Sequence, residues 1–188
     1  YNIDKLREKF GYALISEKTC DALDKIMSNI IKEEGSIAVE NLFCGKKPIE
    51  SMLLEIIRYE NPHFTIHASD KEPLNDEFKK FQINHTQIDY TKENPFADYD
   101  NTSKVVLFMS YPDFPQTHVS KGILKQFMEK GGKHVITIYE PISGMNLSEE
   151  TESIINKHFI AIEETGVPLE IMHSVGIRDW LTHFKRKP

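Results

Sequence analysis

Acidic side chains stand at the ends of three predicted strands. Glu40 lies near the end of a buried strand, Ile37–Asn41, and Asp70 follows a second strand, Phe64–Ala68. Asp89 follows a third, short strand. In open α/β sheets ligands bind at the carboxyl ends of the strands, and a carboxylate there can accept hydrogen bonds from both hydroxyls of a ribose. Asp70 is therefore the candidate ribose ligand of a nucleotide-binding βαβ unit. The alternative is that these acids are solvated or cap the next helix.

The loop after the first strand has an incomplete glycine pattern. Gly45 is its one glycine, where nucleotide-binding loops usually carry two or three. Such glycines let the backbone approach a ligand closely, whereas Leu42 and Phe43 add bulk. Two interpretations follow. A different loop path could leave Gly45 and Lys46 near a cofactor, or the loop has lost the ability to bind one.

Alternating strands and helices must position these residues. Apolar stripes at helical spacing predict helices around residues 16–32, 48–60, 119–128 and 148–157, and continuous apolar runs predict the strands between them. Two final strands without a helix between them indicate an antiparallel hairpin. We therefore predict an α/β fold, a three-layer α/β/α sandwich with a mostly parallel seven-stranded sheet and a C-terminal antiparallel hairpin. Residues 1–188 form one domain in this prediction, with 1–34 as an N-terminal helical segment packed on it.

Composition narrows the classes of protein that the chain can belong to. The chain has 188 residues, 39% hydrophobic, with a net charge of −6, which argues against general nucleic-acid binding. No apolar run approaches the roughly 20 residues of a membrane span. The two cysteines have no paired spacing, so no metal site is predicted and a reducing, cytoplasmic location is expected. His183 is expected at a surface or edge position. Because the chain begins at Tyr1, it is expected to be trimmed or a fragment.

Several short motifs, taken in order, carry a resemblance to a known superfamily. They are Tyr12-Ala13, Glu40, Asp70-Lys-Glu-Pro73, Ser110-Tyr-Pro-Asp113 and Ile138-Tyr-Glu-Pro141. With the predicted order of elements, the chain resembles class I S-adenosylmethionine-dependent methyltransferases with a Rossmann-like fold, in a divergent branch with a degenerate glycine loop. The resemblance implies S-adenosylmethionine as cofactor. It places Glu40 and Gly45 at its methionine end, Asp70 at its ribose and Asp89 at its adenine.

The turn Ser110-Tyr111-Pro112-Asp113 stands where the resembled enzymes that methylate amino groups carry their acceptor motif. The resemblance implies that Ser110 accepts a hydrogen bond from the target, that Tyr111 stacks on it, and that Asp113 acts as a base or attracts a cation. Tyr-Pro-Asp is also good turn chemistry, so a purely structural turn is an equal alternative.

The resemblance leads to two hypotheses about function. The first is methyl transfer to nitrogen or oxygen of an acceptor that is a small molecule, a protein side chain or a nucleobase. The second is a catalytically inactive methyltransferase-like domain that serves as a binding or scaffold module in a larger protein. A nicotinamide-dependent oxidoreductase is disfavoured by the missing glycines and the closing hairpin.

Overall fold

The computed structural model describes eight segments of the chain. These are residues 17–46, 48–60, 62–79, 83–113, 118–139, 147–162, 167–168 and 180–188. The predicted segment 1–34 is therefore described from residue 17 onward, and the motif pieces Tyr12-Ala13 and Glu140-Pro141 lie outside the described residues.

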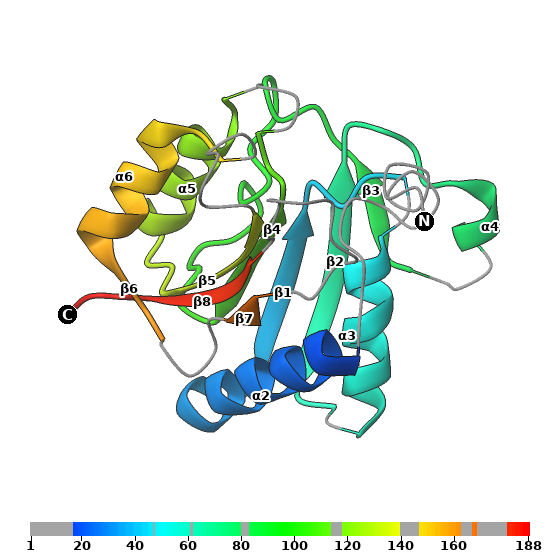
Figure 1. Ribbon diagram of the computed structural model, residues 1–188. Coiled ribbons are helices and arrows are strands. Elements are labelled where there is room, and N and C mark those ends of the chain that lie inside the picture. The colour runs from blue at the N-terminus through cyan, green and yellow to red at the C-terminus, as the bar shows by residue number, and fades with distance from the viewer. Residues whose placement is uncertain are drawn as a thin grey trace.

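A single mixed sheet runs through the described residues (Figure 1). Its strands are β1 (Ile37–Leu42), β2 (Phe64–Asp70), β3 (His85–Gln87), β4 (Val105–Ser110), β5 (His134–Tyr139), β6 (Phe159–Ala161), β7 (Val167–Pro168) and β8 (Trp180–Arg186). Seven strands follow the order β3-β2-β1-β4-β5-β8-β6, and the two-residue β7 also pairs with β8. Strands β1 to β5 are parallel, whereas β8 is antiparallel to β5 and β6. This confirms the predicted parallel sheet with a closing antiparallel hairpin, with β7 as a small addition.

Helices cover both faces of the sheet, as Figure 1 shows. They are α2 (Glu17–Glu34), α3 (Ile49–Glu60), α4 (Asp76–Lys79), α5 (Ser120–Glu129) and α6 (Glu149–His158). The buried stripe of α2 consists of Leu23, Ile26, Met27 and Ile30, at the spacing of one helix face. Gly35 ends this helix at a φ of 80°, a conformation that glycine adopts without strain, and its N–H donates to the Ile31 carbonyl at 2.8 Å.

Two apolar cores lie on opposite faces of the sheet. Alternate residues of each strand point to opposite faces, so Val39 of β1 packs toward α2 and α3, whereas Leu42 packs toward α5 and α6. All six residues of β4 are buried, as expected for a central strand covered on both sides. The same alternation decides on which face of the sheet each polar side chain of β1 and β4 lies.

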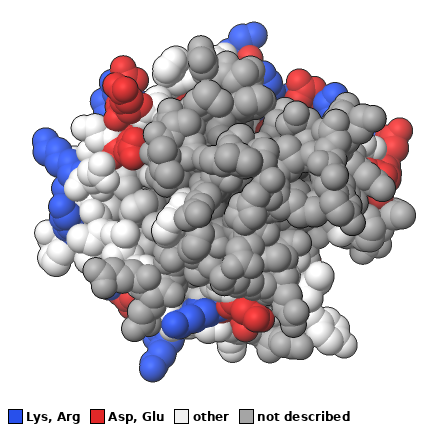
Figure 2. All heavy atoms as spheres, in the orientation of Figure 1, with Lys and Arg blue, Asp and Glu red and all other residues white. Residues whose placement is uncertain are grey.

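The described surface carries charges of both signs. On the face in Figure 2, basic and acidic side chains of described residues are interspersed around the rim. Among the described helices, none combines the length and the apolar character needed to cross a membrane.

Candidate functional site at the carboxyl ends of the strands

The loop after β1 bends toward the end of β2. Phe43 and Gly45 have positive φ angles of 60° and 67°. The Cys44 N–H donates to the Ser69 carbonyl at 3.3 Å, and the Gly45 N–H donates to Oδ2 of Asp70 at 3.0 Å. Because a Cβ on residue 45 would meet no atom within 4 Å, glycine is favoured there by the backbone angle rather than by lack of space. The structure thus brings Gly45 and Asp70 together.

Asp70 retains hydrogen-bonding capacity for a ligand. The residue is 8% exposed, and its Oδ1 accepts the Glu72 N–H at 2.9 Å while Oδ2 accepts from Gly45. A carboxylate has about four acceptor positions, so roughly one remains on each oxygen. These two positions suit the two hydroxyls of a ribose without breaking the existing bonds. The residues at the end of β2 therefore fit a nucleoside cofactor.

Tyr90 is a residue of this region that the sequence does not indicate. Its hydroxyl donates to the Ser69 carbonyl at 2.8 Å and accepts the Phe43 N–H at 3.2 Å. The Phe43 and Tyr90 rings also pack together, with centroids 4.7 Å apart. Burial raises the pKa of Tyr90, so the hydroxyl is neutral and available as a donor. The bulk at Phe43 therefore forms an aromatic pair across the carboxyl ends of β1 and β3.

Asp89 caps its own turn in this structure. Its Oδ1 accepts from the backbone N–H and the hydroxyl of Thr91, at 3.0 and 2.6 Å, and the hydrogen bond from the hydroxyl lowers the pKa of Asp89. Its own N–H donates to the Glu93 carboxylate at 3.2 Å. The side chain is about half exposed. These contacts agree with the alternative that Asp89 caps local backbone rather than binding a ligand. A contact of Asp89 with adenine stays a prediction.

Glu40 lies inside β1 rather than at its end, because β1 continues through Leu42. The side chain is buried, and its two carboxylate oxygens accept from the Tyr99 hydroxyl at 2.5 Å and pair with Nδ1 of His67 at 2.7 Å. The pair with Glu40 raises the pKa of His67, against the opposing effect of burial. The neighbouring Asn41 points to the other face, toward α3. Glu40 therefore belongs to a network separate from the bonds around Asp70, and its contact with a cofactor stays a prediction.

Asp113 holds the beginnings of two helices. It is 2% exposed, its Oδ1 accepts the Ser120 N–H at 3.1 Å, and its Oδ2 accepts the Ser120 hydroxyl at 2.5 Å and the Ser148 N–H at 2.8 Å. Ser120 begins α5, and Ser148 is the N-cap of α6. These contacts favour the structural interpretation of the turn over the interpretation of Asp113 as a base.

Ser110 and Tyr111 are enclosed beside the apolar core under α2 and α3. Ser110 is 5% exposed and Tyr111 is 7% exposed. Tyr111 has a φ of 49° and donates its N–H to the Ile138 carbonyl at 2.9 Å, which ties the turn to β5. Positive φ is uncommon for a bulky residue, and such positions occur at functional sites. Contact of Ser110 and Tyr111 with a methyl acceptor stays a prediction.

A buried carboxyl group lies next to Ser110. Glu50, in the first turn of α3, is 6% exposed, and burial raises its pKa to about 7 against the opposing effects of its own backbone N–H and of the Ser110 hydroxyl. Asn41 donates from its amide to the Ser51 hydroxyl at 2.7 Å. The sequence does not indicate Glu50 as a site residue, because an acid in a first helical turn is equally explained by the helix dipole.

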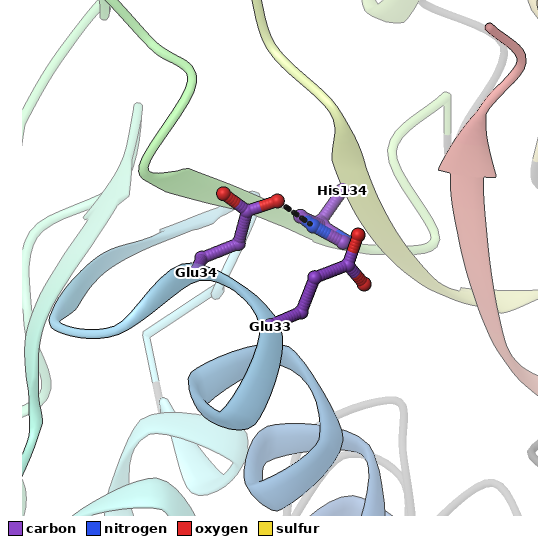
Figure 3. A group of neighbouring side chains, drawn as sticks. All are labelled: Glu33, Glu34 and His134. Atoms are coloured by element: carbon purple, nitrogen blue, oxygen red, sulfur yellow. Dashed lines mark hydrogen bonds and ion pairs between the residues drawn. The ribbon is translucent and has the colours of Figure 1, made fainter.

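A second polar cluster lies at the opposite end of the sheet. Figure 3 shows Glu33 and Glu34, from the last turn of α2, beside His134 at the start of β5. Their ligand atoms all lie within 4.8 Å of one another, and Oε1 of Glu34 is 3.2 Å from Nε2 of His134. Lys133 and Lys185 already pair with Glu34 and Glu33, respectively. The two carboxylates are therefore neutralised, and the arrangement fits a structural ion-pair network rather than a metal site.

His183 completes this cluster and corrects a prediction from the sequence. Its Nε2 lies 3.0 Å from Nδ1 of His134, and it is 4% exposed, so the expectation of a surface or edge position is wrong. The physical reason is that β8 inserts between β5 and β6 instead of forming the sheet edge. Burial and the neighbouring His134 lower the pKa of His183 to about 3.

Solved structures share this fold at low sequence identity. The chain is similar to WbdD, described as a bifunctional kinase-methyltransferase, with a TM-score of 0.63 and 12% identity over 95% of this chain. It is also similar to the N-methyltransferase NodS from Bradyrhizobium japonicum WM9, solved in complex with S-adenosyl-L-homocysteine. The TM-score is 0.56 and the sequence identity 12%, over 88% of this chain and 86% of NodS. A third similar structure is precorrin-6y C5,15-methyltransferase from Geobacter metallireducens GS-15. The TM-score is 0.53 and the sequence identity 9%, over 93% of this chain and 90% of that enzyme.

These similarities define the fold. No protein-family model and no curated protein sequence matches the chain. The chain spans 42% of the length of WbdD. The strand order and the structural similarity together show that the chain has the Rossmann-like fold of class I S-adenosylmethionine-dependent methyltransferases.

Proposed function

We propose that this chain is an S-adenosylmethionine-dependent methyltransferase that transfers a methyl group to nitrogen or oxygen of an acceptor. The observation that carries the proposal is the arrangement of Asp70 and Gly45 at the carboxyl end of β2. A buried carboxylate is held there by a backbone N–H of the β1 loop, with acceptor positions remaining for a ribose diol. The fold supports the same conclusion, because NodS, which shares it, was crystallised with S-adenosyl-L-homocysteine.

The residues of the cofactor side have separate roles in this proposal. Asp70 accepts hydrogen bonds from the ribose, Asp89 lies toward the adenine, and Gly45 lines the methionine end. Glu40, also assigned to the methionine end, must exchange its bond to Tyr99 or His67 to reach a ligand.

On the acceptor side, Ser110 and Tyr111 border the target because they follow the central strand β4. S-adenosylmethionine, when bound, supplies a methyl group already activated on a sulfonium, so the chain mainly has to align the acceptor with it. Asp113 holds the turn against α5 and α6 and thereby positions Ser110 and Tyr111.

A second candidate function is a non-catalytic methyltransferase-like domain within a larger protein. The observation that favours it is the glycine-poor loop, in which the Phe43 ring packs on the Tyr90 ring and the Phe43 backbone N–H donates to the Tyr90 hydroxyl. This aromatic pair fills a position where cofactor-binding loops use small residues.

Calorimetric titration with S-adenosylmethionine and S-adenosylhomocysteine tests the choice between the two functions. We expect both ligands to bind, and Asp70→Ala to weaken binding by about 1–3 kcal/mol through loss of charge-assisted hydrogen bonds. Asp76→Ala is the matched control, because Asp76 is an exposed acid on α4. Absence of binding heat at high micromolar ligand would favour the scaffold function. Unchanged affinity in a folded Asp70→Ala variant would remove Asp70 from the site.

The acceptor belongs to one of three classes, a small molecule, a protein side chain or a nucleobase. Turnover assays with radiolabelled methyl donor and each class of acceptor distinguish them. A cytoplasmic location is part of the proposal, because two cysteines without a paired spacing are typical of proteins from a reducing compartment.

A further inference from the structure

Three polar side chains meet under the N-terminus of α3, where β1 and β4 end. Asn41 and Ser110 lie on the same face of these adjacent strands, since Asn41 is in register with Phe108 and Ser110 follows two residues later. Glu50 reaches them from the first turn of α3, close enough for the Ser110 hydroxyl to affect its ionisation. All three residues are 0–6% exposed, so a group bound among them is shielded from water.

Two of these side chains have buried atoms without a partner. The Asn41 amide nitrogen donates to Ser51, which leaves Oδ1 as the acceptor, and this oxygen has no hydrogen-bond partner among the described residues. The Ser110 oxygen likewise meets no hydrogen-bond partner by geometry among the described residues, although its hydroxyl lies close enough to Glu50 to favour the ionised form of that carboxyl group. Burying a polar group without a hydrogen bond costs free energy, so a ligand that pairs with these atoms would recover that cost.

The chemistry of the cluster specifies a cationic donor. Among the described residues no lysine, arginine or histidine forms an ion pair with Glu50. Asn41 Oδ1 and an ionised Glu50 are acceptors, and the Ser110 hydroxyl can accept as well. A primary ammonium offers three N–H donors and one positive charge, which matches three acceptors of which one is anionic.

We propose that Glu50, Ser110 and Asn41 form a subsite that binds an ammonium group at the carboxyl ends of β1 and β4. The proposed function supplies two sources for this group, the amino-acid end of the cofactor and an amine on the methyl acceptor. The subsite itself rests on the contacts of the three residues. The pKa of Glu50, near 7, means that an ammonium beside it would shift its titration toward acid.

The test follows the carboxyl carbon of Glu50 by NMR in the wild-type protein, assigned through its backbone, during pH titrations. The probes are S-adenosylhomocysteine, which has an ammonium group, 5′-methylthioadenosine, which lacks it, and ethylammonium. We expect S-adenosylhomocysteine or ethylammonium to lower the pKa of Glu50, and 5′-methylthioadenosine to leave it unchanged. An unchanged pKa with all three probes overturns the proposal.

Calorimetry with Glu50→Gln identifies the source of the ammonium. If it belongs to the cofactor, the variant binds S-adenosylhomocysteine about tenfold or more weakly and 5′-methylthioadenosine as the wild type does. If it belongs to the acceptor, both affinities are unchanged and ethylammonium alone lowers the pKa of Glu50. Glu55→Gln, on the half-exposed side of the same helix, is the control. If neither nucleoside binds to the wild type or to either variant, the proposed function fails. The response of the Glu50 pKa to ethylammonium then still shows whether the ammonium subsite exists.

Discussion

The replacement Asp113→Asn separates a structural role of this residue from a catalytic one. Asp113 receives three hydrogen bonds, from the N–H and hydroxyl of Ser120 and from the N–H of Ser148. Thr151 extends the network, since its hydroxyl lies 2.7 Å from that of Ser120 and 2.9 Å from that of Ser148. All three hydroxyls are satisfied when Ser148 donates to Thr151, Thr151 donates to Ser120, and Ser120 donates to the Asp113 carboxyl group. The network therefore uses both oxygens of the Asp113 carboxyl group as acceptors.

An asparagine has one acceptor oxygen and cannot serve both backbone donors in this geometry. If Oδ1 keeps the Ser120 N–H, the amide NH₂ faces the Ser148 N–H and leaves it without a partner. A buried unsatisfied donor costs about 1–3 kcal/mol, and the loss of charge-assisted bonds adds to this. We therefore expect a loss of about 2–4 kcal/mol, a large part of the 5–15 kcal/mol that is typical of a domain.

Urea unfolding followed by circular dichroism and by the fluorescence of the single tryptophan, Trp180, measures this loss. Asp76→Asn, at an exposed position on α4, should change the free energy of unfolding by less than about 0.5 kcal/mol. If Asp113→Asn unfolds at the wild-type urea concentration, the anchoring role is refuted. Unchanged stability together with lost methyl transfer would instead support Asp113 as a base.

Three further predictions concern stability. Gly132→Ala should destabilise the protein by about 1–3 kcal/mol, measured by thermal unfolding, because a Cβ there would lie 2.4 Å from the buried Phe127 ring; an unchanged melting temperature contradicts this packing. Since burial raises the pKa of Glu50 to about 7 from 4.5, the folded state binds the extra proton, and stability should fall by about 3 kcal/mol as pH rises from 4.5 through 7. Glu50→Gln should lack this loss in urea titrations at pH 5 and pH 8, and an identical pH dependence would show that Glu50 is not the group responsible. Because the pKa of His183 is lowered to about 3 from 6.5, the unfolded chain takes up the proton first, so stability should fall as pH drops below 6.5. His183→Gln should flatten the dependence of melting temperature on pH between 6.5 and 4.5, and a slope equal to that of the wild type would argue against this assignment.

The order of elements could be predicted from the sequence because the signals are local. The stripe of α2 repeats at the period of a helix, and β4 is a continuous apolar run, so each can be recognised from neighbouring residues of the sequence alone. Gly35 after α2 and Ser148 before α6 mark helix ends through contacts with residues three or four positions away. The strand-end position of Asp70 follows from the same local pattern.

The tertiary structure decided what each polar side chain does. The neighbours that define Glu40 and Asp113 come from far along the chain: Tyr99 is 59 residues from Glu40, and Ser148 is 35 residues from Asp113. The face on which a strand residue lies depends on register, where a shift of one residue exchanges the two faces, so β1 directs Asn41 toward α3 and Glu40 away from it. The raised pKa of Glu50 is likewise a consequence of burial under packed elements. Periodicity in the sequence fixes which residues form helices and strands, whereas burial, pairing and ionisation depend on the neighbours that folding brings together.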